Sequence, residues 1–525
     1  MTTAPQASAG LADDLTRAGM RKLSLKEKIS YGLGDFGNGF MFDLGQAYLL
    51  YFYTEMAGIT PIAAAGVFAF TKIFDAFMDP VAGTFVDGRR NVGKNGRFRP
   101  VMMYSSIALA VLTVATFVTP NAGHDVNLVY AYVSYAAWGL LYSFTNVPYG
   151  SLASVMTQDS QQRAQLAAFR QAGSVGALLI TGVAFMPIVV AVSGGAAHLT
   201  QAGYIAAAVA MAVVGVLGFF ACYRGTTEAV TVVRDPSEKI TPATFVRTVF
   251  TNRALLTLIL MTVFSISAYN IMPAMMAYFS KYNLHSIELL SVINFFGIGS
   301  SIIAILAIPA LVKRLGKRNT ALLGFGIASV AALLNFLIPT NPYIFTALYA
   351  LTFIGVALPN GVTWAMVSDV IDYGHWRTGV RREGITYSMF NFSRKIAQAL
   401  AAGMAGLGLN IIGYRNNFTD GSMPPEQVNG VLNGIKGLQT LYPAIALALA
   451  ALTLLLFYPL TEQKLLQVLA EIHQRDADEI ARGEVTISEL DGQAPATVTE
   501  AVTGDRPADS TRPTDPDAGD DRRRP

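Results

Sequence analysis

The chain has 525 residues, of which 52% are apolar and only 14% are charged, and its mean hydropathy is +0.42. Soluble proteins carry about a quarter charged residues, so this composition excludes an ordinary soluble domain and indicates an integral membrane protein. The net charge of +3 does not indicate a nucleic-acid partner, because the basic residues cluster in short loops. The single cysteine, Cys222, allows no intramolecular disulfide, and the five scattered histidines predict no metal cluster.

Twelve apolar segments long enough to cross a bilayer follow one another along the chain, each meeting the requirement of about 20 residues. The first six are predicted at 29–54, 60–87, 100–119, 127–152, 165–194 and 201–223. The other six are predicted at 250–279, 287–313, 318–339, 342–368, 383–413 and 434–460. The sequence therefore predicts an all-α membrane protein with twelve transmembrane helices in two six-helix bundles.

Polar segments predict where this architecture is divided. We expect a disordered cytoplasmic N-terminus at 1–24, a first bundle at 25–223, a central cytoplasmic loop at 224–249 and a second bundle at 250–460. Residues 461–482 predict a cytoplasmic amphipathic helix, and 483–525 a disordered tail rich in Pro, Asp, Thr and Gly. The N-terminus lacks a cleavable signal with an apolar core.

Lysine and arginine occur in alternate loops. They cluster at 89–99, 313–318 and 377–382, whereas the loops 121–127 and 193–201 contain none. By the positive-inside rule, both termini are expected in the cytoplasm of a protein that spans the cell membrane several times. The basic turns fall at matching positions of the two halves, which indicates the pseudo-symmetric repeat of a secondary transporter.

Two carboxylates interrupt the second apolar segment. Asp75 and Asp79 are four residues apart, so on a helix they share one face, and Lys72 lies near the same stripe. An acid left bare in a bilayer costs roughly 2.5–3.5 kcal/mol on insertion scales. The pair is therefore solvated in a cavity, paired, or holding a cation. One interpretation is a docking point for H⁺ or a small hard cation, and the other is a salt bridge that pins helices together.

Four motifs in order resemble one transporter family: Tyr31 to Gly37 (YGLGDFG), Phe74 to Pro80 (FDAFMDP), Trp138 to Pro148, and Asp369 to Gly374 (DVIDYG). They are similar to the glycoside–pentoside–hexuronide:cation symporters of the major facilitator superfamily, of which the melibiose permease is the best-known type. The resemblance covers nearly all of residues 25–460. It implies the major facilitator fold and alternating-access transport of a sugar or glycoside together with H⁺, Na⁺ or Li⁺.

The resemblance also implies a coupling-ion site. Asp75 and Asp79 match the family's paired acids, and Ser143 matches a threonine that lines the cation site of the melibiose permease. Asn146 stands where that protein has an aspartate, and the lost negative charge favours H⁺ over Na⁺. No cofactor and no metal other than Na⁺ is expected. For Ser143 and Asn146, in the predicted segment 127–152, the alternative is polar packing between helices.

A sugar site is implied in the same way. Asp43 is a hypothesis of our own, because the Lys–Asp pair of the melibiose permease aligns with Asn38 and Gly39, one turn away. Gly150 replaces an aromatic platform that Trp364 can supply instead, and Lys395 is expected to pair with the acids or to donate to sugar hydroxyls. The expected substrate residues are Asp43, Asn38, Tyr142, Asn146, Tyr149, Arg170, Trp364 and Lys395.

Charged residues near the inner loops predict a cytoplasmic gate. Exposed pairs contribute only ~0–1 kcal/mol each, so only a network of them can bias one state. The expected members are Asp87, Arg89, Arg163, Asp369, Asp372 and Arg377.

Two other functions remain open. A lipid or lysolipid carrier of the same fold needs a lateral apolar opening, whereas a sugar site needs several polar groups and an aromatic face. An intramembrane enzyme can use Asp75 and Asp79 as an acid–base pair, but the sequence has no metal cluster and no Gly-x-Ser-x-Gly motif, so an enzyme is not expected. The expected partners are a small-molecule sugar and membrane lipid, with no nucleic acid, and the expected state is a monomer.

Overall fold

A computed structural model describes residues 22–87, 96–120, 122–157, 159–229, 251–379, 383–416, 418–421 and 423–481. The chain divides into two compact units, Met1–Ala470 and Glu471–Pro525. The first unit holds the membrane-crossing helices. Helix α16 (Glu462–Ala481) contains residues of both units and coincides with the segment expected to form an amphipathic helix.

The helices of residues 25–225, called here the first half, begin with a sequence-encoded cap. The Ser24 hydroxyl accepts from the Glu27 backbone amide, and the Glu27 carboxylate accepts from the Ser24 backbone amide. This capping box satisfies two backbone N–H groups that have no partner within the helix, and so it defines where the first helix begins. The helices of this half are α2 (Leu25–Ala47), α3 (Leu49–Glu55), α4 (Pro61–Asp87), α5 (Phe98–Ala115), α6 (His124–Met156), α7 (Ser160–Ser193) and α8 (Gln201–Gly225).

Residues 253–457, the second half, repeat this pattern. Helix α11 bends at Gly316, where positive φ (77°) separates two helices that are otherwise continuous. The helices are α10 (Arg253–Tyr278), the π-helical turn η1 (Phe279–Asn283), α11 (Leu289–Leu337), α12 (Pro342–Thr378), α13 (Glu383–Ile411), α14 (Pro425–Lys436), the π-helical turn η2 (Gly437–Leu441) and α15 (Tyr442–Phe457).

Six crossings in each half of the described chain result when α2 with α3 counts as one crossing, α14 with α15 as one, and the two parts of α11 as two. The predicted twelve-helix all-α fold is therefore confirmed. Eight of the described helices are by themselves long and apolar enough to cross a membrane. The main difference lies at the end of α12, which continues to Thr378, whereas the apolar segment was expected to end at residue 368. The predicted central loop lies largely outside the described residues.

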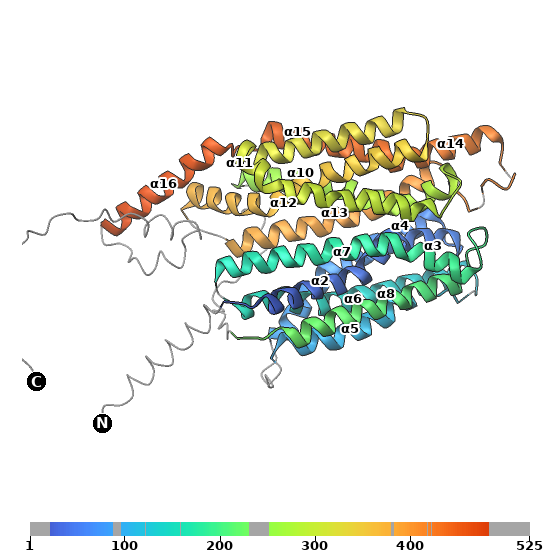
Figure 1. Ribbon diagram of the computed structural model, residues 1–525, viewed down its shortest axis with the longest axis horizontal. Helices are drawn as coiled ribbons and strands as arrows, with labels where there is room; N and C mark the ends of the chain where they lie inside the picture. Colours follow the sequence, from blue (N-terminus) through green and yellow to red (C-terminus); the bar gives the residue numbers. More distant parts are fainter. Residues whose placement is uncertain are drawn as a thin grey trace, which may run out of the picture. The chain divides into compact units, whose positions relative to one another are not determined.

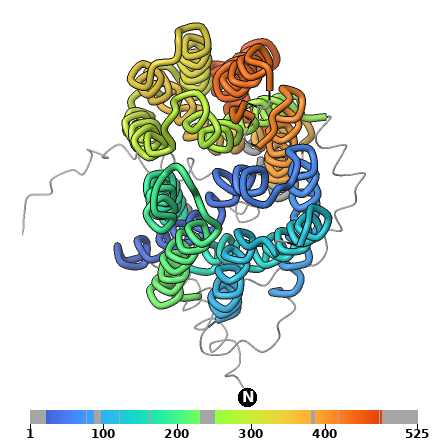
Figure 2. The backbone as a smooth tube through the Cα atoms, turned by 90° about the vertical axis from the view of Figure 1, so that its right-hand side faces the viewer, coloured from blue at the N-terminus to red at the C-terminus, as the bar shows by residue number. Residues whose placement is uncertain are grey.

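The two halves lie side by side as two bundles, blue to green and yellow-green to red in Figure 2, with their helices running along the long axis in Figure 1. They meet mainly where α4 packs on α13 and where α7 packs on α11. Gly406 of α13 lies directly against the Pro61 carbonyl, so that a Cβ at this position would collide with the α4 backbone. A contact this close requires glycine, and it brings the two halves together near the start of α4.

Helix α4 shows how the fold separates lipid-facing from inward-facing residues. Ile73, Phe77 and Phe85 are more than half exposed, and they recur at helical spacing on one stripe. Asp75 is 4% exposed on the opposite stripe. Because an exposed apolar stripe on a bilayer-length helix faces lipid, the carboxylates of α4 point toward the interior of the protein.

Candidate functional site

Asp75 is held against helix α6 at the centre of the first half. Its Oδ1 atom is buried and has no hydrogen-bond partner. A Cβ on Gly139 would overlap this oxygen, so only glycine at that position of α6 allows the carboxylate to approach. A buried polar atom without a partner costs roughly 1–3 kcal/mol, and such atoms are candidates for binding a cation or a proton.

Asp79 joins the two halves. The Ser143 hydroxyl donates to its Oδ1 at 2.7 Å, and the Lys395 ammonium of α13 forms an ion pair with its Oδ2. The side chains of Asp79 and Lys395 are 29% and 26% exposed, although they lie midway along helices with lipid-facing apolar stripes. Such a pair is hydrated from the interior of the protein and not from the lipid side.

Lys72 completes this charged cluster. Its ammonium lies over the aromatic rings of Phe42 and Trp138, 4.7 Å and 5.9 Å from their centroids, and it interacts electrostatically with Asp75. The rings stabilise the cation where water is excluded. Two carboxylates are thus balanced by two ammonium groups, so a bound coupling ion must displace or compete with one of them.

The predicted residues of α2 and α6 meet beside this cluster. The Asn38 Nδ2 donates to the Tyr142 hydroxyl at 3.3 Å, and the Tyr142 ring stacks on Trp138 with centroids 5.2 Å apart. The side-chain oxygens of Asn38 and Asn146 are both buried without a hydrogen-bond partner. These oxygens are free to accept from a substrate hydroxyl or to bind a cation, and their predicted roles stay predictions.

Arg170 of α7 pairs with Asp35 of α2 at 3.4 Å and lies over the Tyr149 ring, 5.2 Å from its centroid. Tyr149 is fully buried, stacks on Tyr31 and donates its hydroxyl to the Tyr31 carbonyl at 2.8 Å. In this position Tyr149 supports Arg170 from within the first half and does not itself reach the space between the halves.

Asp43 borders a small cavity between α2, α7, α10 and α11, which belong to opposite halves. Its carboxylate forms no hydrogen bond or ion pair with the described residues. Other residues that line the cavity are Tyr48, Thr181, Met276 and Asn294. Asp43 is thus an acceptor at the wall of a small cavity between the halves, and its role in binding sugar hydroxyls stays a prediction.

Trp364 of α12 presents its ring toward α13. It stacks with Tyr387 at 5.3 Å between centroids, and the Arg394 guanidinium lies over it at 5.1 Å. The predicted aromatic platform is therefore partly covered by a cation that the sequence analysis did not assign. Arg394 precedes Lys395, and its charge within an apolar segment is the signal that could have identified it.

The residues of the predicted cytoplasmic gate do not join the halves through a described ion pair. Asp369 pairs with Lys317 at 2.6 Å, and both belong to the second half. Arg163 is exposed, and its Nε donates to the Thr157 carbonyl at 2.9 Å. Asp372 is buried and Arg377 is exposed at the end of α12. Arg89 and the side chain of Asp87 lie outside the described residues, so the gate stays a prediction.

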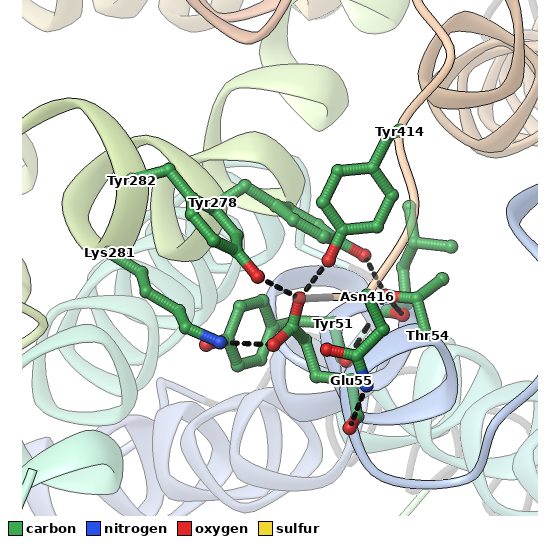
Figure 3. Close-up of polar contacts among 9 residues, drawn as sticks. Tyr51, Thr54, Glu55, Tyr278, Lys281, Tyr282, Tyr414 and Asn416 are labelled. Atoms are coloured by element: carbon green, nitrogen blue, oxygen red, sulfur yellow. Dashed lines mark hydrogen bonds and ion pairs between the residues drawn. The ribbon is translucent and has the colours of Figure 1, made fainter. Parts of the chain in front are cut away.

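The opposite end of the helices is closed by a cluster around Glu55, the last residue of α3 (Figure 3). Its carboxylate pairs with Lys281 and accepts from the hydroxyls of Tyr282, at 2.7 Å, and Tyr414. The Asn416 amide donates to the Glu55 carbonyl at 2.8 Å. All four partners come from the second half. This cluster, called here the Glu55 latch, connects the halves at the end where α4 begins.

Sequence reasoning missed the Glu55 latch. Glu55 is the only acid between Asp43 and Asp75, and it follows the apolar and aromatic run 48–53, which was the one signal present. Its partners are more than 220 residues away along the chain, at separations of 227 for Tyr282 and 359 for Tyr414. No local pattern identifies contacts of that range.

These features define a class of protein: a two-bundle helical membrane transporter with a charged cluster and a cavity between its halves. The family model described as MFS/sugar transport protein matches residues 30–462, and the chain belongs to this family. The chain is thus a major facilitator transporter and not an enzyme.

Individual relatives agree with this assignment. The chain is 50% identical to the Bacillus subtilis (strain 168) protein named uncharacterized symporter YjmB, over 87% of this chain and 96% of that one. It is 37% identical to a Salmonella typhimurium (strain LT2) protein provisionally named a sulfoquinovose importer, over 86% of this chain and 94% of that one. It is 33% identical to the Escherichia coli (strain K12) glucuronide carrier protein homolog, over 87% and 97% of the two chains.

Solved structures match the fold. A bacterial homolog of the human lysosomal transporter Spinster, in an inward-facing and occupied conformation, has a TM-score of 0.58 at 14% identity, over 86% of this chain and 97% of that one. A structure of proton-dependent oligopeptide transporters has a TM-score of 0.57 at 14% identity, over 86% and 100% of the two chains. At this level of identity the likeness extends to the fold alone.

Proposed function

We propose that this protein is a secondary active symporter that carries a sugar or glycoside across the cell membrane with a cation, H⁺ in preference to Na⁺, by alternating access. The observation that carries the proposal is the Asp79–Lys395 pair, which links α4 and α13 of opposite halves and borders the unpartnered Asp75 oxygen. The relatives named for sulfoquinovose and glucuronide support a sugar as the cargo.

The coupling step follows from the charges of this cluster. A proton on Asp79 removes the charge that holds Lys395, so the link between α4 and α13 weakens when the proton binds. Substrate binding between the halves can then be tied to the change of access, because both events act on the same interface. Release of the proton on the other side restores the pair.

Two features favour H⁺ over Na⁺. Sodium requires several oxygen ligands and gains from each additional negative charge, but Lys395 already occupies one Asp79 oxygen and Asn146 supplies a neutral carbonyl. A proton needs only one carboxylate oxygen. The cluster is therefore better suited to exchange a proton than to enclose a sodium ion.

We further propose that the Glu55 latch closes the outer end and that both termini lie in the cytoplasm. The end opposite to the latch carries Arg97 and Arg99 at the start of α5 and the basic segment 313–318, which the positive-inside rule places inside. We infer an inward-facing state from the Glu55 latch, which joins the halves at the end opposite to the basic segments.

The test is uptake into proteoliposomes with the ion gradients imposed separately. Initial uptake of radiolabelled sugars is measured with an inward proton gradient, with an inward Na⁺ gradient at constant pH, and with a protonophore. We expect the proton gradient to drive accumulation and the protonophore to abolish it. Uptake that depends on Na⁺ and ignores the protonophore at fixed membrane voltage would contradict the proton assignment and leave the sugar assignment intact.

A further inference from the structure

Asp43 is an acid without a partner inside a membrane-crossing helix. It lies near the end of α2, and within the described residues its carboxylate makes no hydrogen bond and no ion pair. Two other acids of the same core differ in this respect: Asp35 pairs with Arg170, and Asp79 pairs with Lys395. Asp43 therefore lacks the cation that balances the charge of the other two.

The surroundings of Asp43 are mainly apolar. A Cβ at Gly39, one turn earlier, would collide with Ala177 and lie 3.3 Å from the Asp43 Oδ2 atom, so this oxygen lies beside the close contact of α2 with α7. The apolar side chains that line the adjoining cavity include Leu178, Met276, Leu290 and Ile298. Thr181 lines it too, and its hydroxyl has no hydrogen-bond partner among the described residues. An ionised carboxylate without a cation is strongly disfavoured in such surroundings, and it takes up a proton instead.

The titratable groups described around Asp43 do not supply a positive charge to it. They are Asp35 on the same helix, Tyr48 in the wall of the cavity and Tyr269 on α10. Arg170 of the neighbouring α7 is paired with Asp35. The negative charge of an ionised Asp43 would thus depend on water for its stabilisation.

Access of water to Asp43 depends on how the halves are placed. The Asn294 amide of α11 donates to the Gly182 carbonyl of α7 at 2.9 Å, and both residues line the cavity, so a hydrogen bond between the halves closes its wall. Tyr48, which lines the cavity, is joined to Glu55 by α3, which is 7 residues or about 10 Å long. The cavity therefore lies near the Glu55 latch, and parting of the halves at the latch end would open it.

We propose that Asp43 is a second proton-binding site of this transporter, separate from the Asp79–Lys395 pair, and that binding of its proton is linked to closure of the outer end. The assignment rests on the proposed function, since it adds a second proton to the coupling that Asp79 provides. Closure of the α7–α11 contact removes water from Asp43 and so favours the protonated acid, and protonation favours closure to the same extent. The protonated acid can both donate to and accept from a sugar hydroxyl, so this role is compatible with the predicted one.

The test is infrared difference spectroscopy of the purified full-length protein in liposomes, titrated with acid and base without any sugar. A protonated carboxyl group has a C=O stretching band that an ionised carboxylate lacks, and the band shifts when the proton is replaced by a deuteron from D₂O. Asp43→Asn cannot hold the proton, and Asp43→Glu keeps an acid at this position. Asp125→Asn is the matched control, because Asp125 is an exposed acid in the first turn of α6.

We expect the wild-type protein to show this band at a pH at which exposed acids are ionised. The band should be lost in Asp43→Asn, shifted in Asp43→Glu and unchanged in Asp125→Asn. The shift in Asp43→Glu identifies the band even if Asp43→Asn fails to fold. Glu55→Gln weakens the latch, so its band should disappear at a lower pH than in the wild type, because the open state hydrates the carboxyl group and favours its ionised form.

Three results would overturn the proposal. An unchanged spectrum in both Asp43 variants would show that Asp43 is ionised. A band of Asp43 that neither titrates nor shifts in D₂O would make the residue a permanently neutral, structural one. Equal titration in the wild type and in Glu55→Gln would separate the proton from closure of the outer end. The proposed function fails in a different way: an exchanging Asp43 band without proton-driven uptake would reject proton symport and keep the proton-binding site.

Discussion

Among the residues that the structure describes, two carboxylate–ammonium pairs join the halves of this transporter, and they differ in how completely their polar atoms are satisfied. At the Glu55 latch, a carboxylate that is 4% exposed is surrounded by Lys281 and two tyrosine hydroxyls. At the central cluster, Asp79 is 29% exposed and has Lys395 and Ser143, while the neighbouring Asp75 oxygen has no partner. Both oxygens of the Glu55 carboxylate have partners, whereas the central cluster keeps one carboxylate oxygen without a partner. The latch is therefore a complete polar network, and the central cluster is an incomplete one.

The difference indicates different roles. A fully satisfied polar network rigidifies one arrangement of the elements that it connects, so the latch is suited to hold one conformation. An incomplete network has spare acceptor capacity and can gain or lose a proton or a ligand without dismantling its surroundings. The central cluster is therefore suited to coupling. Variants of each pair should separate these roles.

The largest effect is expected for Asp79→Asn. This change keeps the shape of the side chain but removes the charge that binds Lys395 and that a proton would neutralise. Accumulation driven by an ion gradient should fall until the internal and external sugar concentrations are equal, while exchange across the membrane persists. The measurement is steady-state accumulation and exchange in the same liposomes. Full accumulation at normal expression would show that Asp79 has only a structural role.

Removal of the basic partner should be nearly as severe. Lys395→Ala leaves Asp75 and Asp79 of α4 uncompensated on one side, and we expect initial uptake to fall about tenfold to a hundredfold. Lys395→Arg keeps the charge with a different shape and should retain part of the activity. Wild-type uptake by the alanine variant would separate Lys395 from coupling.

The Glu55 latch should respond more weakly and in a different observable. Glu55→Gln can still accept from the tyrosines but loses the ion pair with Lys281. We expect the closed end to open more often, which is measured by labelling Thr181→Cys, a cavity-lining position, with a membrane-impermeant maleimide added outside cells. The background carries Cys222→Ser, since Cys222 is the one native cysteine.

Labelling should become about tenfold faster, as expected for the loss of one charged hydrogen bond. Glu426→Gln is the control, because Glu426 is an exposed acid at the start of α14 outside the latch. If Glu55→Gln leaves the labelling rate unchanged, the latch does not limit opening of this end.

The central cluster could be predicted from the sequence and the Glu55 latch could not, and the reason is physical. The helices and the central acids could be predicted because a bilayer demands long apolar segments, in which a charge at helical spacing is conspicuous. The Glu55 latch could not, because Tyr282 and Tyr414 are brought to Glu55 only by the packing of the two halves. Helix α12 also exceeds its apolar segment: it continues to Thr378 and ends at Gly379, which has the left-handed conformation of a helix C-cap.

The smallest effect is expected for Asn146→Asp, which tests whether Asn146 belongs to the incomplete central cluster. The Asn146 oxygen is buried beside the central cluster without a hydrogen-bond partner. A carboxylate there adds a third acid to Asp75 and Asp79, which strengthens the attraction for Na⁺ as long as the new acid stays ionised. We expect the ratio of Na⁺-driven to proton-driven initial uptake to rise several-fold, measured at constant pH with each gradient imposed alone. Asn335→Asp, at a buried asparagine of α11 outside the cluster, is the control. An unchanged ratio in Asn146→Asp, with normal uptake, would place Asn146 outside the coupling site and leave the incomplete cluster as Asp75, Asp79 and Lys395 alone.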